Sequence, residues 1–255
     1  YSVSESEDIA KKEMADSGVY LSYDVNKAEN EYFKIDFNLD GSFNIFEKTG
    51  KKTFYNQNIF EDCEDFGDEY NFKGSEKNPY TTLNKKADIS IFKHGRTFVT
   101  YLVKHILKKS LDSDTSAELK CYIHVENGAL GVKIKTEIDN KAKNHRIRAI
   151  FDSGISADKC IADGHFNYIK RDIMPDGNWK NPSNCQRMCN FVEVSDDNCG
   201  LIAAVRGLPE YEVLNNGKGT IAITLLRAVG EMGDWFYFPT PEAQCLGNNE
   251  CEYAL

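Results

Sequence analysis

Apolar side chains at every second position are the feature of this sequence that most constrains its fold. Phe33, Ile35, Phe37 and Leu39 alternate with charged or amide residues. Because a period of two places successive side chains on opposite faces, such a run predicts a strand with one buried face. No sustained 3.6-residue apolar stripe accompanies it, apart from a short segment at 7–15 for which we predict a helix. The pattern therefore predicts an all-β chain.

Turn-forming residues lie between these runs, as connections between antiparallel strands require. Asp40-Gly41 follows the first run and predicts a two-residue hairpin turn. Alternation recurs at 119–125 and 130–138, on either side of Asn127-Gly128, which predicts a second hairpin with Leu130 on the buried face. We predict further strands at 98–107, 147–151, 165–170, 191–194, 201–205 and 220–226.

This many strands with almost no helix indicates a sandwich or barrel. A length of 255 residues with 41% hydrophobic residues suits one large β domain. We expect residues 1–28 to be a lead-in from a preceding domain and residues 29–255 to form a β-sandwich. We also expect this domain to be truncated at its C-terminus, because residues 252–255 read as strand without a following turn.

Composition excludes several classes of partner. The formal net charge is −9 and the sequence pI is about 5.2, whereas nucleic-acid binding needs clustered cations. No apolar stretch approaches the ~20 residues that span a bilayer, and residues 1–7 lack the basic and apolar regions of a signal peptide. We therefore expect no nucleic-acid partner and no membrane partner.

Eight cysteines permit disulfides in an oxidising compartment but do not require them. Cys121 lies on an alternating strand among apolar neighbours, where a free thiol behaves as a small buried hydrophobe. We predict reduced thiols and a cytoplasmic location. Pairing among Cys185, Cys189 and Cys199 stays open as an alternative.

The spacing of polar residues predicts no metal site and no catalytic residue within this chain. The five histidines are isolated from one another, without the short His spacings of a zinc site. Six of the nine residues at 61–69 are acidic. For Glu61, Asp62 and Glu64 we interpret this run as a solvated turn. A calcium loop is a weaker alternative, because the usual ligand spacing is missing.

Five sequence blocks, in order, carry a resemblance to a known family. They are Asp62–Asn71, Asn144–Arg148, Gly200–Val213, Ile223–Gly230 and Pro241–Gly247. Together they resemble the C-terminal β region of the α-mannosidases of glycoside hydrolase family 38, over roughly residues 29–255. The resemblance implies a large antiparallel supersandwich of the galactose-mutarotase type. One departure is Asn184–Met188, where the family often has a His-Pro pair.

The same resemblance implies a function for the parent protein: hydrolysis of terminal α-mannosidic bonds with retention of configuration. In that family the nucleophile and a divalent metal, expected to be zinc, belong to the preceding catalytic domain. This chain is then a non-catalytic domain that packs on the catalytic domain of the same polypeptide, completes the active site and contacts a mannose-containing glycan.

The implied substrate-binding residues are Asp65, Asp68, Tyr70 and Arg148. Gly67 and neighbouring aromatic residues suit the first three to a sugar-facing loop. Arg148 shares a strand face with Arg146, and a surface ion pair is the alternative for both arginines. For Arg227, Glu210 and Gln244, which look like family signature positions, we predict a buried charge pair.

Two other functions stay open. A free-standing carbohydrate-binding or interaction module would show an exposed aromatic row on one sheet face, to which Trp179 and Trp235 are candidate contributors. A mutarotase-like sugar enzyme would bring a pair of histidines together in the sandwich cleft.

Overall fold

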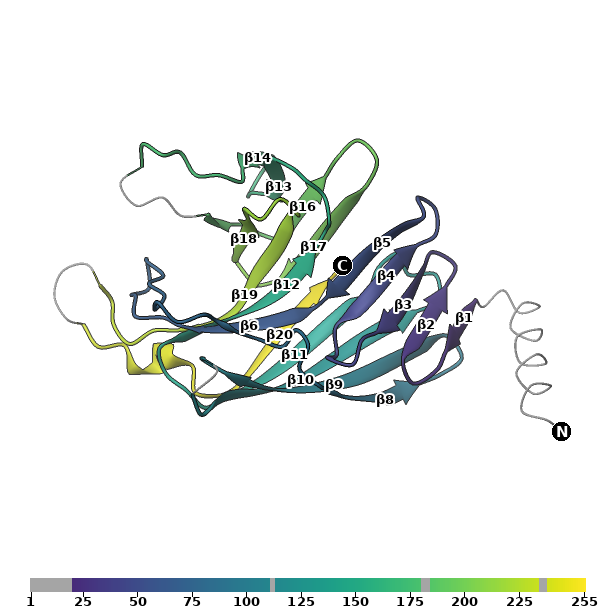
Figure 1. The fold of residues 1–255 in the computed structure, drawn as a ribbon, viewed down its shortest axis with the longest axis horizontal. Coiled ribbons are helices and arrows are strands. Elements are labelled where there is room, and N and C mark those ends of the chain that lie inside the picture. Colours follow the sequence, from purple (N-terminus) through teal and green to yellow (C-terminus); the bar gives the residue numbers. More distant parts are fainter. Residues whose placement is uncertain (1–19, 111–112, 180–183, 234–237) are drawn as a thin grey trace.

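The computed structural model of the chain describes residues 20–110, 113–179, 184–233 and 238–255. Within these ranges the chain forms three antiparallel sheets and one short helical element, the 3-10 helix η1 (Pro241–Gln244) (Figure 1). The all-β, antiparallel sandwich predicted from the sequence is confirmed. The helix predicted at 7–15 lies outside the described residues.

The largest sheet has nine strands. In order across the sheet they are β14 (Tyr168–Asp172), β13 (Lys159–Asp163), β16 (Phe191–Ser195), β17 (Gly200–Arg206), β20 (Gly247–Ala254), β11 (Lys133–Asn140), β10 (Thr115–Glu126), β9 (Phe98–Lys108) and β8 (Asp88–His94). Although β20 is last in the sequence, it lies inside the sheet, paired along its length with β11 and at its end with β17.

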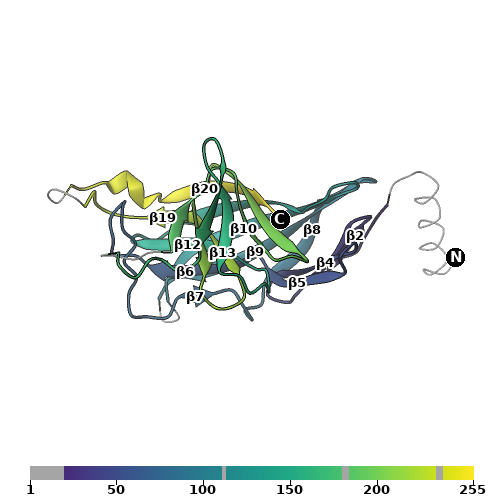
Figure 2. The same ribbon diagram turned by 90° about the horizontal axis from the view of Figure 1, so that it is seen from above.

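A six-stranded sheet faces the nine-stranded one. Its strands are, in order, β15 (Cys185–Arg187), β18 (Glu210–Leu214), β19 (Thr220–Ala228), β12 (His145–Asp152), β6 (Ile59–Glu64) and β7 (Tyr80–Thr81). The third sheet is a five-stranded meander of β1 (Leu21–Tyr23), β2 (Lys27–Asn30), β3 (Phe33–Phe37), β4 (Phe43–Glu47) and β5 (Lys52–Gln57). Figure 2 shows this meander at the opposite end of the molecule from η1.

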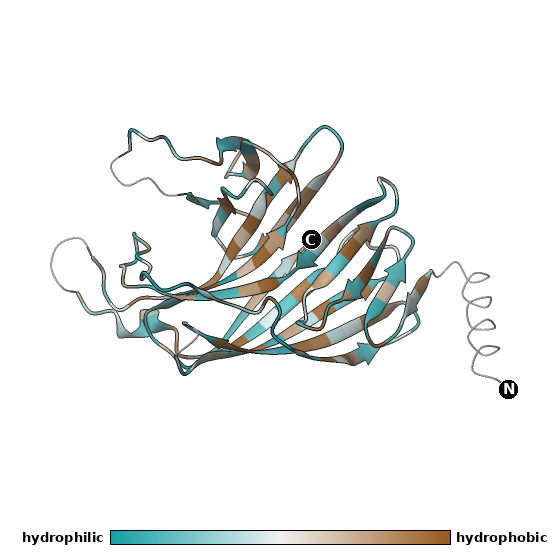
Figure 3. Cartoon of the chain, in the orientation of Figure 1, coloured by the Kyte–Doolittle hydropathy of each residue, from teal (hydrophilic) through white to brown (hydrophobic). Residues whose placement is uncertain are grey.

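The core lies between the sheets. Phe151 of β12 packs edge-on against Tyr253 of β20, with ring centroids 5.8 Å apart. The meander is joined to β9 by Tyr101, whose ring packs at a tilt against Phe37 with centroids 4.7 Å apart and whose hydroxyl donates to the backbone oxygen of Lys27. Hydrophobic and hydrophilic residues accordingly alternate along the strands (Figure 3). Each large apolar side chain buried in this way contributes about 1.5–3 kcal/mol relative to exposure.

The first turn prediction and the predicted burial of Leu130 need correction. The first hairpin turn is centred on Leu39 and Asp40, since the Gly41 nitrogen donates to the Asn38 oxygen, and Leu39 is 85% exposed rather than buried. Gly41 follows with φ +78°, and a Cβ there would lie 2.4 Å from Val103 Cγ1, so only glycine fits.

In the second hairpin, Leu130 is 80% exposed because the paired region begins at Val132, which exchanges two backbone hydrogen bonds with Leu255. The strand predicted at 165–170 is also displaced. A turn at Gly164 and Asn167 occupies its start, and β14 begins only at Tyr168.

Strands β12 and β6 are covered on both faces. Ile147 and Ala149 of β12 point into the sandwich core, yet Arg146 and Arg148 on the other face are also buried. A register shift between Ile147 and Arg148 separates the two arginines along β19. Because neither face meets open solvent, a simple alternation of buried and solvated residues does not describe these strands.

Candidate functional site

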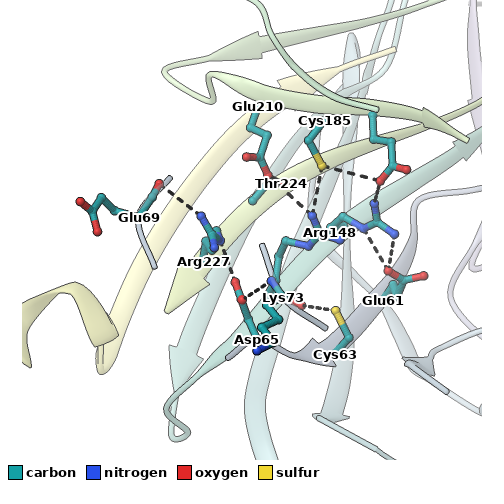
Figure 4. Close-up of polar contacts among 12 residues, drawn as sticks. Glu61, Cys63, Asp65, Glu69, Lys73, Arg148, Cys185, Glu210, Thr224 and Arg227 are labelled. Carbon is teal, nitrogen blue, oxygen red and sulfur yellow. Dashed lines mark hydrogen bonds and ion pairs between the residues drawn. The ribbon is translucent and has the colours of Figure 1, made fainter. Parts of the chain in front are cut away.

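Charged side chains gather on the face of the six-stranded sheet that turns away from the nine-stranded sheet (Figure 4). We call this group the charged face; its members come from β6, β12, β15, β18, β19 and the segment after β6. They are Glu61, Cys63, Asp65, Arg146, Arg148, Cys185, Glu210, Glu212, Thr224 and Arg227. It contains two of the four predicted site residues, Asp65 and Arg148.

Arg148 is held by two carboxylates of this chain. Its Nε and Nη2 donate to Glu61 Oε1 at 2.9 and 2.6 Å, and its Nη1 donates to Glu212. The side chain is only 8% exposed. Burial by itself lowers the pKa of a guanidinium, but the Glu61 and Glu212 carboxylates outweigh it and raise the pKa of Arg148. The arginine therefore clamps β6 to β18 across the sheet.

Arg146, next to it on the same face, is much less completely paired. Its guanidinium lies 3.5 Å above the ring of Phe72, and Nη1 is 3.3 Å from Cys185 Sγ and 3.9 Å from Glu210. Its buried Nε has no hydrogen-bond partner within the described residues. The surface ion pair considered for both arginines is wrong, because both are buried by residues that fold over the sheet.

Asp65 organises the loop that follows β6, which we call the acidic loop (residues 65–74). Its Oδ1 accepts hydrogen bonds from the backbone of Gly67 and Lys73, and its Oδ2 accepts from Arg227 Nε at 2.7 Å. A Cβ at Gly67 would lie 1.7 Å from the oxygen of Asn71, so the loop closes tightly only around glycine. Of the three positions predicted to form a buried charge pair, Arg227 does so with Asp65, whereas Glu210 accepts the Thr224 hydroxyl and Gln244 bonds to Asn144.

Half-buried Asp68 and exposed Tyr70 lie in the outer part of the same loop. Asp68 Oδ1 accepts the backbone N–H groups of Tyr70 and Asn71 at 2.9 and 2.8 Å. Slight burial raises the pKa of this carboxyl, but the backbone donors outweigh it and leave the pKa lowered. Tyr70 is 64% exposed, and Phe66 beside it is also exposed. A charged carboxylate and two rings are thus presented by a fixed turn.

The acidic loop is also hydrogen-bonded to the end of β19 and to the segment that follows it. Arg227 Nη1 donates to the backbone oxygen of Glu69, whose carboxylate accepts the backbone N–H of Gly233. The sequence therefore placed Asp65, Asp68 and Tyr70 correctly in one loop. Arg148 belongs to the adjoining buried network, with no described contact to that loop's exposed residues.

A buried polar chain under this site went unrecognised in the sequence. Asp62 Oδ1 lies 2.8 Å from His145 Nδ1, its other oxygen accepts the Ser116 hydroxyl, and His145 Nε2 lies 2.9 Å from Asn140 Oδ1. Because the Asn140 amide nitrogen donates to the backbone oxygen of Gln244, its oxygen is the acceptor, so His145 Nε2 carries a proton. Burial raises the pKa of Asp62, against the opposing bonds from His145 and Ser116.

Asp62 also corrects the interpretation of the acidic run as a solvated turn. It has 0% exposure, and Glu61 and Glu64 are strand residues with ion pairs. The serine, aspartate and histidine do not form a nucleophilic relay, because the serine donates to the aspartate and all three side chains are buried. In the sequence, Asp62 and His145 lie in two of the family blocks, Asp62–Asn71 and Asn144–Arg148, whereas Ser116 lies in none of them.

No metal centre accompanies these residues. Within the described ranges, no three His, Cys, Asp or Glu side chains gather closely enough to hold a metal ion. Trp179 is 54% exposed, and Trp235 lies outside the described residues. Nor does any helix in the described part of the chain have the length and apolarity to cross a membrane.

Comparison with known proteins identifies the class that this fold and loop define. Residues 28–233 match the family described as the C-terminal domain of family 38 glycosyl hydrolases. The chain belongs to this family, as the resemblance of its sequence blocks predicted.

Individual relatives agree and are all much longer. A protein of Halalkalibacterium halodurans, provisionally assigned as a mannosylglycerate hydrolase, is 34% identical over 91% of this chain and 28% of its own length. The crystal structure of an α-mannosidase from Enterococcus faecalis V583 matches with a TM-score of 0.85 and 31% identity, over 90% of this chain and 29% of that one. A second family 38 structure from Enterococcus faecalis gives a TM-score of 0.82 at 31% identity, covering 90% and 30%. The chain spans less than a third of each relative.

Proposed function

We propose that this chain is the non-catalytic C-terminal β domain of a larger glycoside hydrolase that cleaves terminal α-mannosidic bonds with retention. Membership of the family and the greater length of its relatives support this proposal. The nucleophile and a divalent metal, which we expect to be zinc, would belong to a catalytic domain of the same polypeptide.

The observation that carries the proposal is the construction of the acidic loop. Asp65 and Arg227 hold the loop from its buried side, while half-buried Asp68 and exposed Tyr70 lie in its outer part. Side chains that bind a sugar act best when the backbone that presents them is already fixed. We propose that Asp68 and Tyr70 contact the mannose-containing glycan, or the pocket that holds it, across the junction with the catalytic domain.

Asp65 and Arg148 would support this contact rather than make it. All three nitrogens of the Arg148 guanidinium already donate to Glu61 and Glu212, and Asp65 has 1% exposure. A side chain whose polar atoms are committed inside the domain would have to break those bonds before reaching a substrate. Its contribution would then be to hold the sheet and the loop in place.

The test uses the full-length polypeptide that contains this chain. Asp68→Asn retains an oxygen that caps the turn but removes the charge, so a charge-assisted contact worth ~1.5–3 kcal/mol would lower kcat/KM on an α-mannoside by roughly tenfold to a hundredfold. Tyr70→Phe, which removes one neutral hydrogen bond, would lower it by roughly two- to tenfold.

Matched controls exist elsewhere in the chain. Asp196 caps an exposed turn through the same pair of backbone contacts, to Asn198 and Cys199, and Tyr55 is 62% exposed on the distant meander. Asp196→Asn and Tyr55→Phe should leave kcat/KM unchanged. Equal values for the wild type, Asp68→Asn and Tyr70→Phe would refute the proposed contact.

A further inference from the structure

The eight thiols of the chain differ sharply in their surroundings. Five of them are disfavoured as thiolates. Burial raises the pKa of Cys63, Cys121 and Cys251 to about 11, and it also raises the pKa of Cys160 and Cys185. Since the thiolate is the nucleophilic form of cysteine, these five are poorly placed to react. The half-exposed Cys189, Cys199 and Cys245 remain.

Two of the remaining thiols face oxygen acceptors. Cys245 Sγ donates to the backbone oxygen of Ala243 at 3.5 Å. Cys199 forms a side-chain hydrogen bond to the Asp196 carboxylate, which also accepts its backbone N–H. In both contacts the sulfur is the hydrogen-bond donor, and it faces an oxygen acceptor.

Cys189 faces a nitrogen base instead. Its Sγ lies 3.5 Å from His165 Nδ1, and Arg187 Nη2 lies 2.9 Å from His165 Nε2 and 3.1 Å from Nδ1. Because a guanidinium only donates, Arg187 meets the histidine ring as an acceptor, and it lies at a similar distance from both ring nitrogens. The Cys189 thiol therefore has a ring nitrogen within reach for its proton and a cation close by, which are the surroundings of a reactive cysteine.

The position of this thiol is fixed by its backbone. The Cys189 N–H donates to Asp163 Oδ1 at 3.0 Å, and the same carboxylate accepts the backbone N–H groups of Asn190 and Phe191. The other Asp163 oxygen accepts a hydrogen bond from the Asn190 side-chain amide, so both oxygens of this carboxylate have donors. The cationic Arg187 and the exposed ring of His165 lie on the side of the sulfur.

We propose that Cys189, activated by His165 and Arg187, is the reactive thiol of this chain and a modification site for small-molecule disulfides. In the reaction, the Cys189 thiolate attacks one sulfur of the disulfide. A new S–S bond forms to Cys189 as the original S–S bond breaks, and the second sulfur leaves as a thiolate. The proton that Cys189 gave up to water is matched by the proton that the leaving thiolate takes up.

The test is a competition among thiols in the native chain. The protein is exposed at pH 6.5 to a limiting amount of oxidised glutathione, and modified cysteines are located and timed by peptide mass analysis. Cys189 should react about tenfold faster than Cys199 or Cys245, the magnitude expected for one charge-assisted hydrogen bond. In denaturant all eight thiols should react at similar rates.

Variants separate activation from mere exposure. His165→Gln should slow modification of Cys189 about tenfold while leaving Cys199 and Cys245 unchanged, and Arg187→Gln should slow it to a lesser extent. Both side chains are exposed, so the fold should tolerate their replacement, as an unchanged melting temperature would verify. Modification of Cys199 or Cys245 at the rate of Cys189, or less than a threefold effect of His165→Gln, would overturn the proposal.

Discussion

Asp65 and Arg227 lie 162 positions apart in the sequence, yet Asp65 Oδ2 accepts the Arg227 Nε hydrogen bond at 2.7 Å. The pair joins the acidic loop after β6 to the end of β19, two elements separated in the sheet by β12. Asp65 is fully buried and Arg227 nearly so. The loop that presents half-buried Asp68 and exposed Tyr70 therefore depends on a contact that forms only in the folded domain.

Asp65→Ala should destabilise the chain by about 3–5 kcal/mol, because it leaves a mostly buried guanidinium without its carboxylate and two loop N–H groups without an acceptor. Urea unfolding of the chain measures this loss. Asp68→Ala, which removes a half-buried turn cap, should cost only about 0.5–2 kcal/mol. Equal losses in the two variants would contradict the bracing role of Asp65.

Arg148→Met should destabilise the chain by about 2–4 kcal/mol, since Glu61 and Glu212 would lose their shared partner while remaining partly buried. The matched control is Arg206→Met, because Arg206 is 84% exposed and, among the described residues, forms its ion pair with Glu252. That surface pair should contribute ~0–1 kcal/mol. In the full-length protein, a loss of kcat/KM in Arg148→Met at unchanged stability would instead make Arg148 a direct substrate contact.

His105 should make the chain less stable in mild acid. Burial lowers its pKa to about 4 from an ordinary 6.5, despite the opposing charge of Asp40, and its buried Nε2 has no partner in the described part of the chain. Between these two pH values the unfolded chain binds the proton and the folded chain does not. The stabilisation is therefore complete above pH 6.5 and falls by roughly 3 kcal/mol as the pH drops to about 4.

The variant His105→Phe isolates this effect, because a phenyl ring can still pack against Phe60. Urea unfolding at pH 7 and pH 4.5 should show a smaller acid-induced loss in the variant than in the wild type. Asp62 has a raised pKa, so its contribution to stability falls as the pH rises above its ordinary pKa, opposite to the contribution of His105. Because both proteins contain Asp62, this contribution cancels in the comparison. If stability falls equally with pH in the variant and in the wild type, His105 is not the cause of the acid-induced loss.

The isolated 255-residue chain should not hydrolyse an aryl α-mannoside, whichever divalent ion is added. The acidic loop offers exposed carboxylates, but its buried Asp65 is committed to Arg227 and to the loop backbone. The assay is release of the aryl group by the purified chain, compared with buffer and with full-length protein. Metal-dependent turnover that Asp68→Asn abolishes would contradict the non-catalytic assignment.

Local pattern was enough to predict the fold class of this protein. Alternation at Phe33 and Ile35 identified one strand of the meander, β3, and the runs around Cys121 and Ile134 identified two long strands of the largest sheet. Strand periodicity is visible in sequence because neighbouring positions decide it. The ordered family blocks likewise placed Asp65, Asp68 and Tyr70 in one loop, where the structure has them.

Tertiary structure alone decided which charges are buried and what they bind. Nothing near Asp62 in the sequence shows that it meets His145, and nothing near Arg148 shows that Glu212 completes its pairing from 64 positions away. Leu39 and Leu130 fit the apolar period but lie in turns, because backbone pairing ends before them. A period of two records which side of a strand a residue occupies. It does not record what covers that side, and on β6 and β12 the covering residues come from distant parts of the chain.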